Sequence, residues 1–213
     1  MRAIRKGVGP EELARFRAQP GAVYDGGGFT PVKDRIREQL LVEQGRLCAY
    51  CMQRIAADSM KVEHWRCRKN YPDGQLDYGN LLGCCSGNEG ARGKEQHCDS
   101  KKGDDDIIFN PADPNHHPRL RIRYFGDGTI VSDDDRFKAE IEEILNLNWS
   151  RLRENRKKVL DAVIGALGRD HGPRTRAEIR RLIKKWNSTD AEGRLREYCD
   201  VVIYYLSKKL KAL

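Results

Sequence analysis

The sequence predicts an α+β protein with a small cysteine-rich core, an N-terminal helix, a β-hairpin and a C-terminal helical lobe. Three observations favour this class. Residues 48–103 are rich in Gly, Cys, His and Asn and poor in long periodic segments, as expected of a loop-dominated core. Two short segments typical of β-strands flank a Gly-Asp-Gly triplet at 126–128. From residue 136 onward, apolar residues recur at helical spacing.

Length and composition narrow the possibilities further. A chain of 213 residues suits one domain, or a small catalytic module with a helical appendage. Its 38% hydrophobic and 34% charged residues make it polar, but regular apolar spacing argues against disorder. No stretch approaches the roughly 18 apolar residues that cross a bilayer, and the basic N-terminus has no apolar segment behind it. We therefore expect a cytoplasmic protein without membrane contact.

The N-terminal part is expected to be helical. Residues 10–16 begin with Pro followed by two Glu, which is typical of a helix start. After a break at Gly26–Gly28, a firmer helix is predicted over 31–44, with Gly45 as its stop. This helix delivers the chain directly to Cys48.

A β-hairpin and a set of helices are predicted after the core. The hairpin strands are residues 119–125 and 129–132, and apolar residues alternate with arginines in the first of them. Three apolar stripes then follow at helical spacing and are expected to be buried. Their members are Leu152, Val159, Leu160, Val163, Ile164 and Leu167; Ile179, Leu182, Ile183 and Trp186; and Leu195, Tyr198, Cys199, Val202, Leu206 and Leu210.

Four segments result: an N-terminal arm and helix at 1–47, the core at 48–110, a linker and hairpin at 111–135, and a helical lobe at 136–213. Residues 1–135 hold 21 Lys and Arg against 21 Asp and Glu, whereas the last segment holds 19 against 11. The net charge of +8 therefore lies in the C-terminal lobe. Such a lobe suits phosphate binding, although a merely solvated helical surface has the same composition.

Two separated pairs of cysteines in the core have metal-site spacing. Cys48 and Cys51 form a Cys-x-x-Cys knuckle, and Cys98 pairs with either Cys84 or Cys85. A reducing cytosol argues against disulfides, whereas four thiolates bind one tetrahedral Zn²⁺ as a closed structural site. The sequence therefore predicts a zinc staple that holds the loop-rich core together.

Between the cysteine pairs lies a carboxylate beside an imidazole. Glu63 and His64 follow Lys61 and Val62, which are predicted to form a short strand. Phosphodiester hydrolysis needs a base for the attacking water and oxygen ligands for a hard divalent cation. His64 suits the first role because its unperturbed pKa lies near neutral pH, and Glu63 suits the second. Taken alone, however, the Glu-His dipeptide is common and carries little weight.

The order of motifs around this dipeptide is more specific. Cys-x-x-Cys at 48–51 is followed by Glu63-His64, then Asn-Leu-Leu at 80–82, then Cys-Asp-x-x-Lys at 98–102. In this order the sequence resembles the HNH endonucleases, which have a ββα-metal fold that is often stapled by a four-cysteine zinc. The resemblance implies a phosphodiester hydrolase with Mg²⁺ or Mn²⁺ at its catalytic site. The family usually places a cysteine five residues after the middle Asn, which favours Cys85 over Cys84.

The resemblance also implies a role for each motif residue. His64 would be the general base, and Glu63 an acidic ligand of the catalytic cation. Asn80 would brace the loop and help to orient the base. Asp99 stands where the family often has His or Asn and would be a second cation ligand, with His97 as the alternative. A further residue, Lys102, lies one helical turn after Asp99; it either contacts the scissile phosphate or is an ordinary surface lysine.

A narrower resemblance covers most of residues 1–110. Met1-Arg2-x-Ile4-x-Lys6, the Cys-Ala-Tyr-Cys knuckle, Glu63-His64-Trp65 with Tyr71-Pro72, and Gly87-Asn88-Glu89-Gly90 before His97-Cys98-Asp99 occur together. This set is similar to the HNH nuclease subunit of Septu-type bacterial antiphage systems, which also accompanies some retrons. The similarity implies a bacterial cytoplasmic protein and an ABC-type ATPase partner that holds the nuclease in check and senses infection.

Several alternatives stay open at this point. A zinc-ribbon-like adaptor without catalysis would keep the cysteines and the basic lobe but would have no use for Glu63, His64 and Asp99 together. The substrate is more readily DNA than RNA, and both fit the motifs. The C-terminal helices either grip the nucleic-acid backbone or dock the ATPase.

Overall fold

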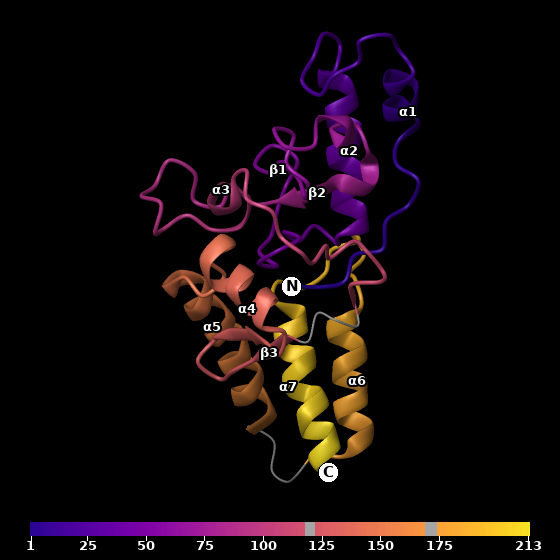
Figure 1. Cartoon of the computed structure of the whole chain (residues 1–213). Coiled ribbons are helices and arrows are strands. Elements are labelled where there is room, and N and C mark those ends of the chain that lie inside the picture. The colour runs from indigo at the N-terminus through magenta and orange to yellow at the C-terminus, as the bar shows by residue number, and fades with distance from the viewer. Residues whose placement is uncertain (118–121, 169–173) are drawn as a thin grey trace.

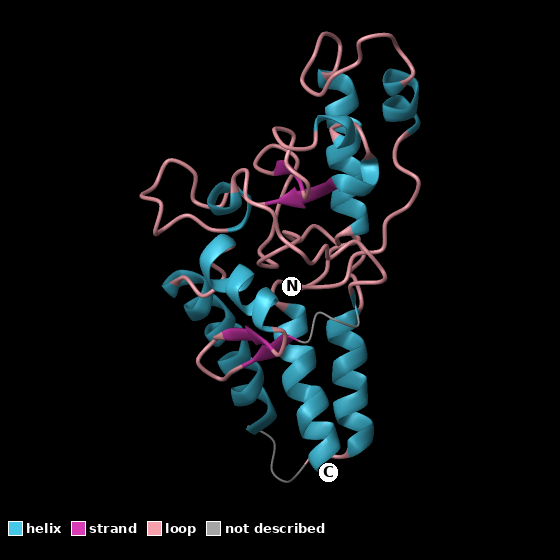
Figure 2. Ribbon diagram, viewed as in Figure 1, coloured by secondary structure: helices cyan, strands magenta, loops and turns pink. Residues whose placement is uncertain are grey.

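The computed structural model describes residues 1–117, 122–168 and 174–213 and has the predicted α+β architecture (Figures 1 and 2). Figure 1 shows the small strands β1 and β2 beside α2, with the helices α5, α6 and α7 gathered at the other end of the molecule. The helices are α1 (Glu11–Arg17), α2 (Thr30–Glu43), α3 (Cys98–Lys102), α4 (Asp135–Ala139), α5 (Ser150–Gly168), α6 (Arg176–Asn187) and α7 (Cys199–Ala212). The strands are β1 (Lys61–His64), β2 (Leu81–Cys84), β3 (Ile122–Tyr124) and β4 (Ile130–Ser132).

The core consists of β1, β2 and α3 in that order, as the ββα expectation requires. The two strands pair antiparallel, with His64 opposite Leu81 and Lys61 opposite Cys84. Leu81 and Leu82 of β2 are fully buried, and because neighbouring strand residues point to opposite faces, both faces of this small sheet are covered. Two strands alone bury too little to be stable in water, so helices and a metal must complete the core.

Helix α2 supports the core from the N-terminal side. Its second residue is Pro31, a favoured first-turn position, and Ile36 and Leu40 are completely buried on its inner face. Gly45 ends it in the left-handed region with a φ of +57°. A Cβ at Gly45 would lie 2.5 Å from Leu195 Cγ, so this glycine also permits close packing against the C-terminal lobe.

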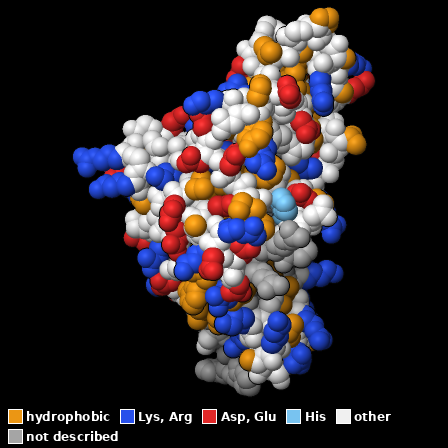
Figure 3. Space-filling view, viewed as in Figure 1, with side chains coloured by type: hydrophobic (Ala, Val, Ile, Leu, Met, Phe, Trp, Pro, Cys, Tyr) orange, Lys and Arg blue, Asp and Glu red, His pale blue; other side chains and the backbone are white. Residues whose placement is uncertain are grey.

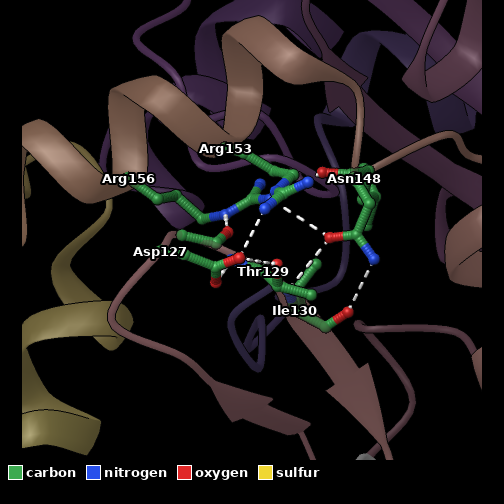
Figure 4. Close-up of polar contacts among 8 residues, drawn as sticks. Asp127, Thr129, Ile130, Asn148, Arg153 and Arg156 are labelled. Atoms are coloured by element: carbon green, nitrogen blue, oxygen red, sulfur yellow. Dashed lines mark hydrogen bonds and ion pairs between the residues drawn. The ribbon is translucent and has the colours of Figure 1, made fainter.

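The hairpin of β3 and β4 is fastened to α5 by two arginines (Figure 4). Arg156 is 1% exposed and donates to the backbone carbonyl oxygens of Gly128 and Leu147 at 2.6 and 2.7 Å. Arg153 pairs with Asp127 in the hairpin turn. The predicted hairpin is therefore present, although residues 119–121 of its first predicted strand lie outside the described residues.

The C-terminal lobe contains the predicted helices, but the last one begins later than its apolar stripe suggested. Helix α7 begins at Cys199, and the preceding Tyr198 has a left-handed φ of +55°. Leu195 and Tyr198 instead donate backbone hydrogen bonds to the carbonyl oxygens of Gly45 and Met52. The prediction that Leu195 and Tyr198 belong to the helical stripe was therefore wrong, because their backbone is engaged by the zinc knuckle region.

One apolar cluster runs through the cysteine-rich ββα core, the hairpin, α4 and the start of α5, from Met1 to Leu152. Further apolar clusters lie between α5, α6 and α7. On the face seen in Figure 3, Lys and Arg side chains gather over α6 and α7, in agreement with the basic C-terminal segment. In the described part of the chain, no helix combines the length and the apolar character needed to cross a membrane.

Candidate active site and metal centre

The four cysteines of the predicted staple converge in space. Among the described residues, Cys48, Cys51, Cys85 and Cys98 form the one group of three or more metal-binding side chains whose donor atoms all lie within 4.8 Å of one another. The Sγ atoms of Cys48 and Cys98 are 3.8 Å apart, and those of Cys51 and Cys85 are 3.7 Å apart. A tetrahedral zinc with Zn–S bonds of about 2.3 Å requires S···S distances of about 3.8 Å. The thiols therefore fit a structural zinc.

The structure also distinguishes the alternative residues near this cluster. Cys85 belongs to it, whereas Cys84 ends β2 and is buried beside the cluster without being part of it. The ring of His97 stacks on Trp149 with its Nδ1 3.2 Å from Cys98 Sγ. His97 is thus a buried neighbour of the thiolates. Such neighbours orient metal ligands, and His97 is not among the residues that line the cavity described next.

A cavity of about 300 Å³ lies between α2, β1 and the start of α3. Glu63 and His64 at the end of β1 and Asp99 in the first turn of α3 all line it. Residues separated by 35 positions in the sequence therefore meet at one solvent-accessible site. The ligand atoms of these three residues do not all lie within 4.8 Å of one another, so the group is looser than that of the four thiols.

The Glu63 carboxylate is held in an unusual electrostatic environment. It is 3% exposed, and its Oε1 accepts hydrogen bonds from the Tyr50 hydroxyl and the Lys102 ammonium, both at 3.0 Å. Burial, together with the hydrogen bond and negative charge of Asp99, raises the pKa of Glu63 well above its usual value, and Lys102 opposes this rise. Two carboxylates this close favour a proton or a cation between them. The pair therefore suits a hard divalent ion, which prefers oxygen ligands.

The imidazole of His64 is oriented by its neighbours. Its Nε2 lies 3.0 Å from the backbone oxygen of Gln75, and the Tyr24 ring meets it edge-on at a centroid distance of 4.5 Å. A carbonyl can only accept, so Nε2 carries the hydrogen and the lone pair of the neutral ring is on Nδ1. Burial lowers the pKa of His64 to about 4. The ring is therefore neutral at physiological pH and able to accept a proton.

Asn80 braces the loop that holds His64. Its Oδ1 accepts from the backbone N–H of Arg66 at 2.7 Å, and its Nδ2 donates to the carbonyl oxygens of Arg66 and Gly74 at 2.9 and 3.1 Å. Gly74 immediately precedes Gln75, whose carbonyl accepts from His64. Asn80 therefore fixes both ends of the loop beside the imidazole, which is the arrangement expected of the middle motif residue.

Lys102 lies in a different place from the one predicted. Its side chain has no exposed surface, and its ammonium pairs with Glu63 and donates to the carbonyl oxygen of His64 at 3.2 Å. Lys102 is also absent from the residues that line the cavity. This placement does not support a contact with substrate phosphate, because the cation is already engaged beneath the carboxylate.

Sequence reasoning missed three groups at the site. Tyr24 and the Gln75 carbonyl both contact His64, and Lys61 lies 3.2 Å from Asp99 with its ammonium nitrogen. Tyr24 and Gln75 reach the site from loops without any periodic pattern. Lys61, by contrast, could have been found from the sequence. It lies two residues before Glu63 in β1, so both side chains are on one face of the strand.

Comparison with known proteins agrees with this architecture. No sequence model of a protein family matches the chain. The chain is 30% identical over 166 residues to the protein named "Retron Vc95 putative HNH endonuclease" from Vibrio cholerae serotype O1 biovar El Tor, and the match covers 72% of this chain and 78% of the relative. A ββα core with a four-cysteine cluster defines a zinc-stapled nuclease fold. The chain belongs to the HNH endonuclease family, and it is an endonuclease, as its motif order predicts.

Proposed function

We propose that this endonuclease hydrolyses phosphodiester bonds of nucleic acid, with DNA as the preferred substrate, at the cavity that holds Glu63, His64 and Asp99. The observation that supports the proposal most strongly is that the acidic side chains of Glu63 and Asp99 line one cavity together with a neutral imidazole. Glu63 is paired with the buried Lys102, and the partly exposed Asp99 with Lys61, so both acidic side chains are held in place where a metal-dependent hydrolase needs oxygen ligands.

In this proposal each residue has a defined task. His64 takes the proton of the attacking water at Nδ1, while the Gln75 carbonyl holds its Nε2–H. Asn80 keeps the loop in place and acts as a positioning residue. Tyr50 and Lys102 hold the Glu63 carboxylate towards Asp99. The chain thus presents a base and an oxygen-rich site whose positions are fixed before substrate arrives.

Two metals have separate roles in the proposal. Zinc at the four thiolates is structural, because four protein ligands leave no open position for water. Glu63 and Asp99 would hold Mg²⁺ or Mn²⁺, which supplies charge stabilisation for the phosphate and the leaving oxygen when it is bound. The donor chemistry supports this division, since thiolates favour zinc and carboxylates favour the harder ions.

We also propose that the protein is the effector nuclease of a bacterial antiphage defence complex, acting in the cytoplasm with an ABC-type ATPase. Two observations support this context. The relative from Vibrio cholerae carries a retron in its name, and the motif set of residues 1–110 is similar to that of Septu-type nuclease subunits. The ATPase would restrain the nuclease until infection is sensed.

A plasmid-nicking assay tests the catalytic proposal. Zinc-loaded protein should convert supercoiled plasmid to open-circular DNA with added Mg²⁺ or Mn²⁺ and should not do so with added Zn²⁺ alone. EDTA should stop the reaction, and excess Mg²⁺ should restore it. Tight DNA binding without any cleavage under these conditions, by protein alone and with its ATPase, would favour the non-catalytic adaptor instead.

A further inference from the structure

The cavity of the candidate active site has a second half that is built outside the ββα core. Lys33 and Arg37 of α2, Arg68 from the loop after β1, and Tyr24 from the N-terminal arm all line it. Lys33 and Arg37 are four residues apart and therefore share one face of their helix. Three cations thus surround the part of the cavity that lies away from the carboxylates.

Two buried polar groups in this half have no partner. The Tyr24 hydroxyl and the Arg37 Nε are both inaccessible to solvent and make no hydrogen bond among the described residues. Both belong to side chains that line the cavity, and the hydroxyl senses the charges of Arg68 and Arg37. Buried donors in native proteins are nearly always satisfied. Neither atom touches the solvent in the cavity, so a bound acceptor reaches them only after a small side-chain movement.

A carboxylate stands where such an acceptor would sit. Asp25 places Oδ1 2.8 Å from the Lys33 ammonium and Oδ2 3.5 Å from the Arg68 guanidinium. It does so from a left-handed backbone conformation with a φ of +60°, which is uncommon outside glycine. One anionic group bridging two cations at the cavity mouth has the charge and the two-oxygen geometry of a phosphodiester.

We infer that Lys33, Arg37 and Arg68 bind a phosphate of the nucleic-acid backbone next to the scissile one, with the Tyr24 hydroxyl as a further donor and Asp25 as its stand-in when substrate is absent. This inference rests on the proposed function. The scissile phosphate itself belongs at Glu63 and Asp99, so the second subsite sets the direction in which the strand crosses the cavity. The N-terminal arm then contributes to substrate binding as well as to folding.

The inference predicts effects of opposite sign on binding. Arg68→Ala or Lys33→Ala removes a phosphate contact and should weaken binding. The association constant should then fall less steeply with salt, with the slope of log K against log [salt] smaller in magnitude by about 0.9 for duplex DNA. Tyr24→Phe keeps the ring against His64 and should weaken binding by loss of one donor. Asp25→Asn removes the competing carboxylate, suits the left-handed backbone, and should bind more tightly than the unaltered chain.

Binding is measured by fluorescence anisotropy on a short labelled DNA duplex and on an RNA duplex of the same sequence, without added divalent ion. Arg35→Ala is the matched control, because Arg35 lies on α2 but pairs with Glu12 and Glu38 away from the cavity. Tighter binding by Asp25→Asn together with weaker binding by Arg68→Ala supports the subsite. Unchanged affinity in both, while the unaltered chain binds and cleaves, overturns this inference alone. Absence of binding to either duplex overturns the proposed function with it.

Discussion

The His64 imidazole is held in place by contacts that come from outside its own strand. The Gln75 carbonyl fixes the tautomer, Asn80 braces the loop that carries this carbonyl, and Tyr24 packs on the ring edge. The sequence identified His64 and Asn80 because motif spacing records them. It could not identify Tyr24 or Gln75, because their contacts join segments 40 and 11 residues away and depend on how the loops close.

We predict that His64→Ala lowers the rate of Mg²⁺-dependent cleavage by about 10²- to 10⁴-fold, because the general base is lost. Zinc content and melting temperature should stay close to those of the unaltered protein. His117→Ala is the control, since His117 bonds to the Pro111 carbonyl oxygen and does not line the cavity. Cleavage at the normal rate by the His64→Ala protein would remove His64 from the mechanism.

Lys102 shows where residue-level prediction fails. In the five-residue helix α3 the sequence does not reveal which side faces the cavity, and the buried side proved to hold this lysine. We predict that Lys102→Met lowers the free energy of unfolding by about 3–5 kcal/mol, because it leaves the Glu63 carboxylate buried without its cation.

Lys101→Met, one position earlier in α3, is the matched control and should change stability by less than about 0.5 kcal/mol. Urea denaturation measures both variants. If Lys102→Met kept normal stability but raised the KM for nucleic acid, the lysine would return to its predicted role as a phosphate contact.

At the scale of elements, the zinc cluster connects pieces that could not assemble alone. The knuckle at Cys48 and Cys51, the residue after β2 and the start of α3 meet at the four thiols, with few hydrogen bonds to join them otherwise, such as those from Ala49 to Gly83 and from Ser100 to Ser86. We predict that Cys51→Ser gives zinc-free protein that is largely unfolded, because metal binding and folding are coupled in small zinc modules. Metal analysis and circular dichroism measure this result.

Cys84→Ala provides the comparison for this variant. Cys84 is buried next to Cys85 but is not part of the cluster, so its variant should retain one zinc per chain. A folded, zinc-free Cys51→Ser protein, or loss of zinc from Cys84→Ala, would count against the proposed ligand set.

Element prediction succeeded where local signals dominate and failed where a distant segment overrides them. Pro31 and Gly45 delimit α2 almost as predicted, and the Gly-Asp-Gly turn produces its hairpin. By contrast, the apolar stripe that includes Leu195 suggested helix, but hydrogen bonds to Gly45 and Met52 hold that segment in a non-helical loop until α7 begins. No periodicity in the sequence records such a contact.

At the scale of the whole molecule, the segment with the excess positive charge contributes no residue to the cavity that holds Glu63, His64 and Asp99. The C-terminal lobe carries the net charge, and Figure 3 shows its basic side chains over α6 and α7. We predict that reversing Lys184 and Lys185 to Glu weakens DNA binding and lowers its salt dependence, because backbone binding releases counterions.

Reversal of Arg15 and Arg17 to Glu, two exposed positions on α1 in the N-terminal arm, controls for the same change in net charge. An unchanged salt slope for the Lys184 and Lys185 variant, together with loss of ATPase copurification in high salt, would assign the lobe to the partner instead of the nucleic acid.

The central claim is that Glu63 and Asp99 bind one hard cation beside His64. Titration calorimetry of Mn²⁺ into zinc-loaded protein tests it most directly. We predict one Mn²⁺ site per chain that is lost in Asp99→Asn and in Glu63→Gln, with zinc content unchanged in both. Equal Mn²⁺ binding by the unaltered protein and both variants would contradict the claim.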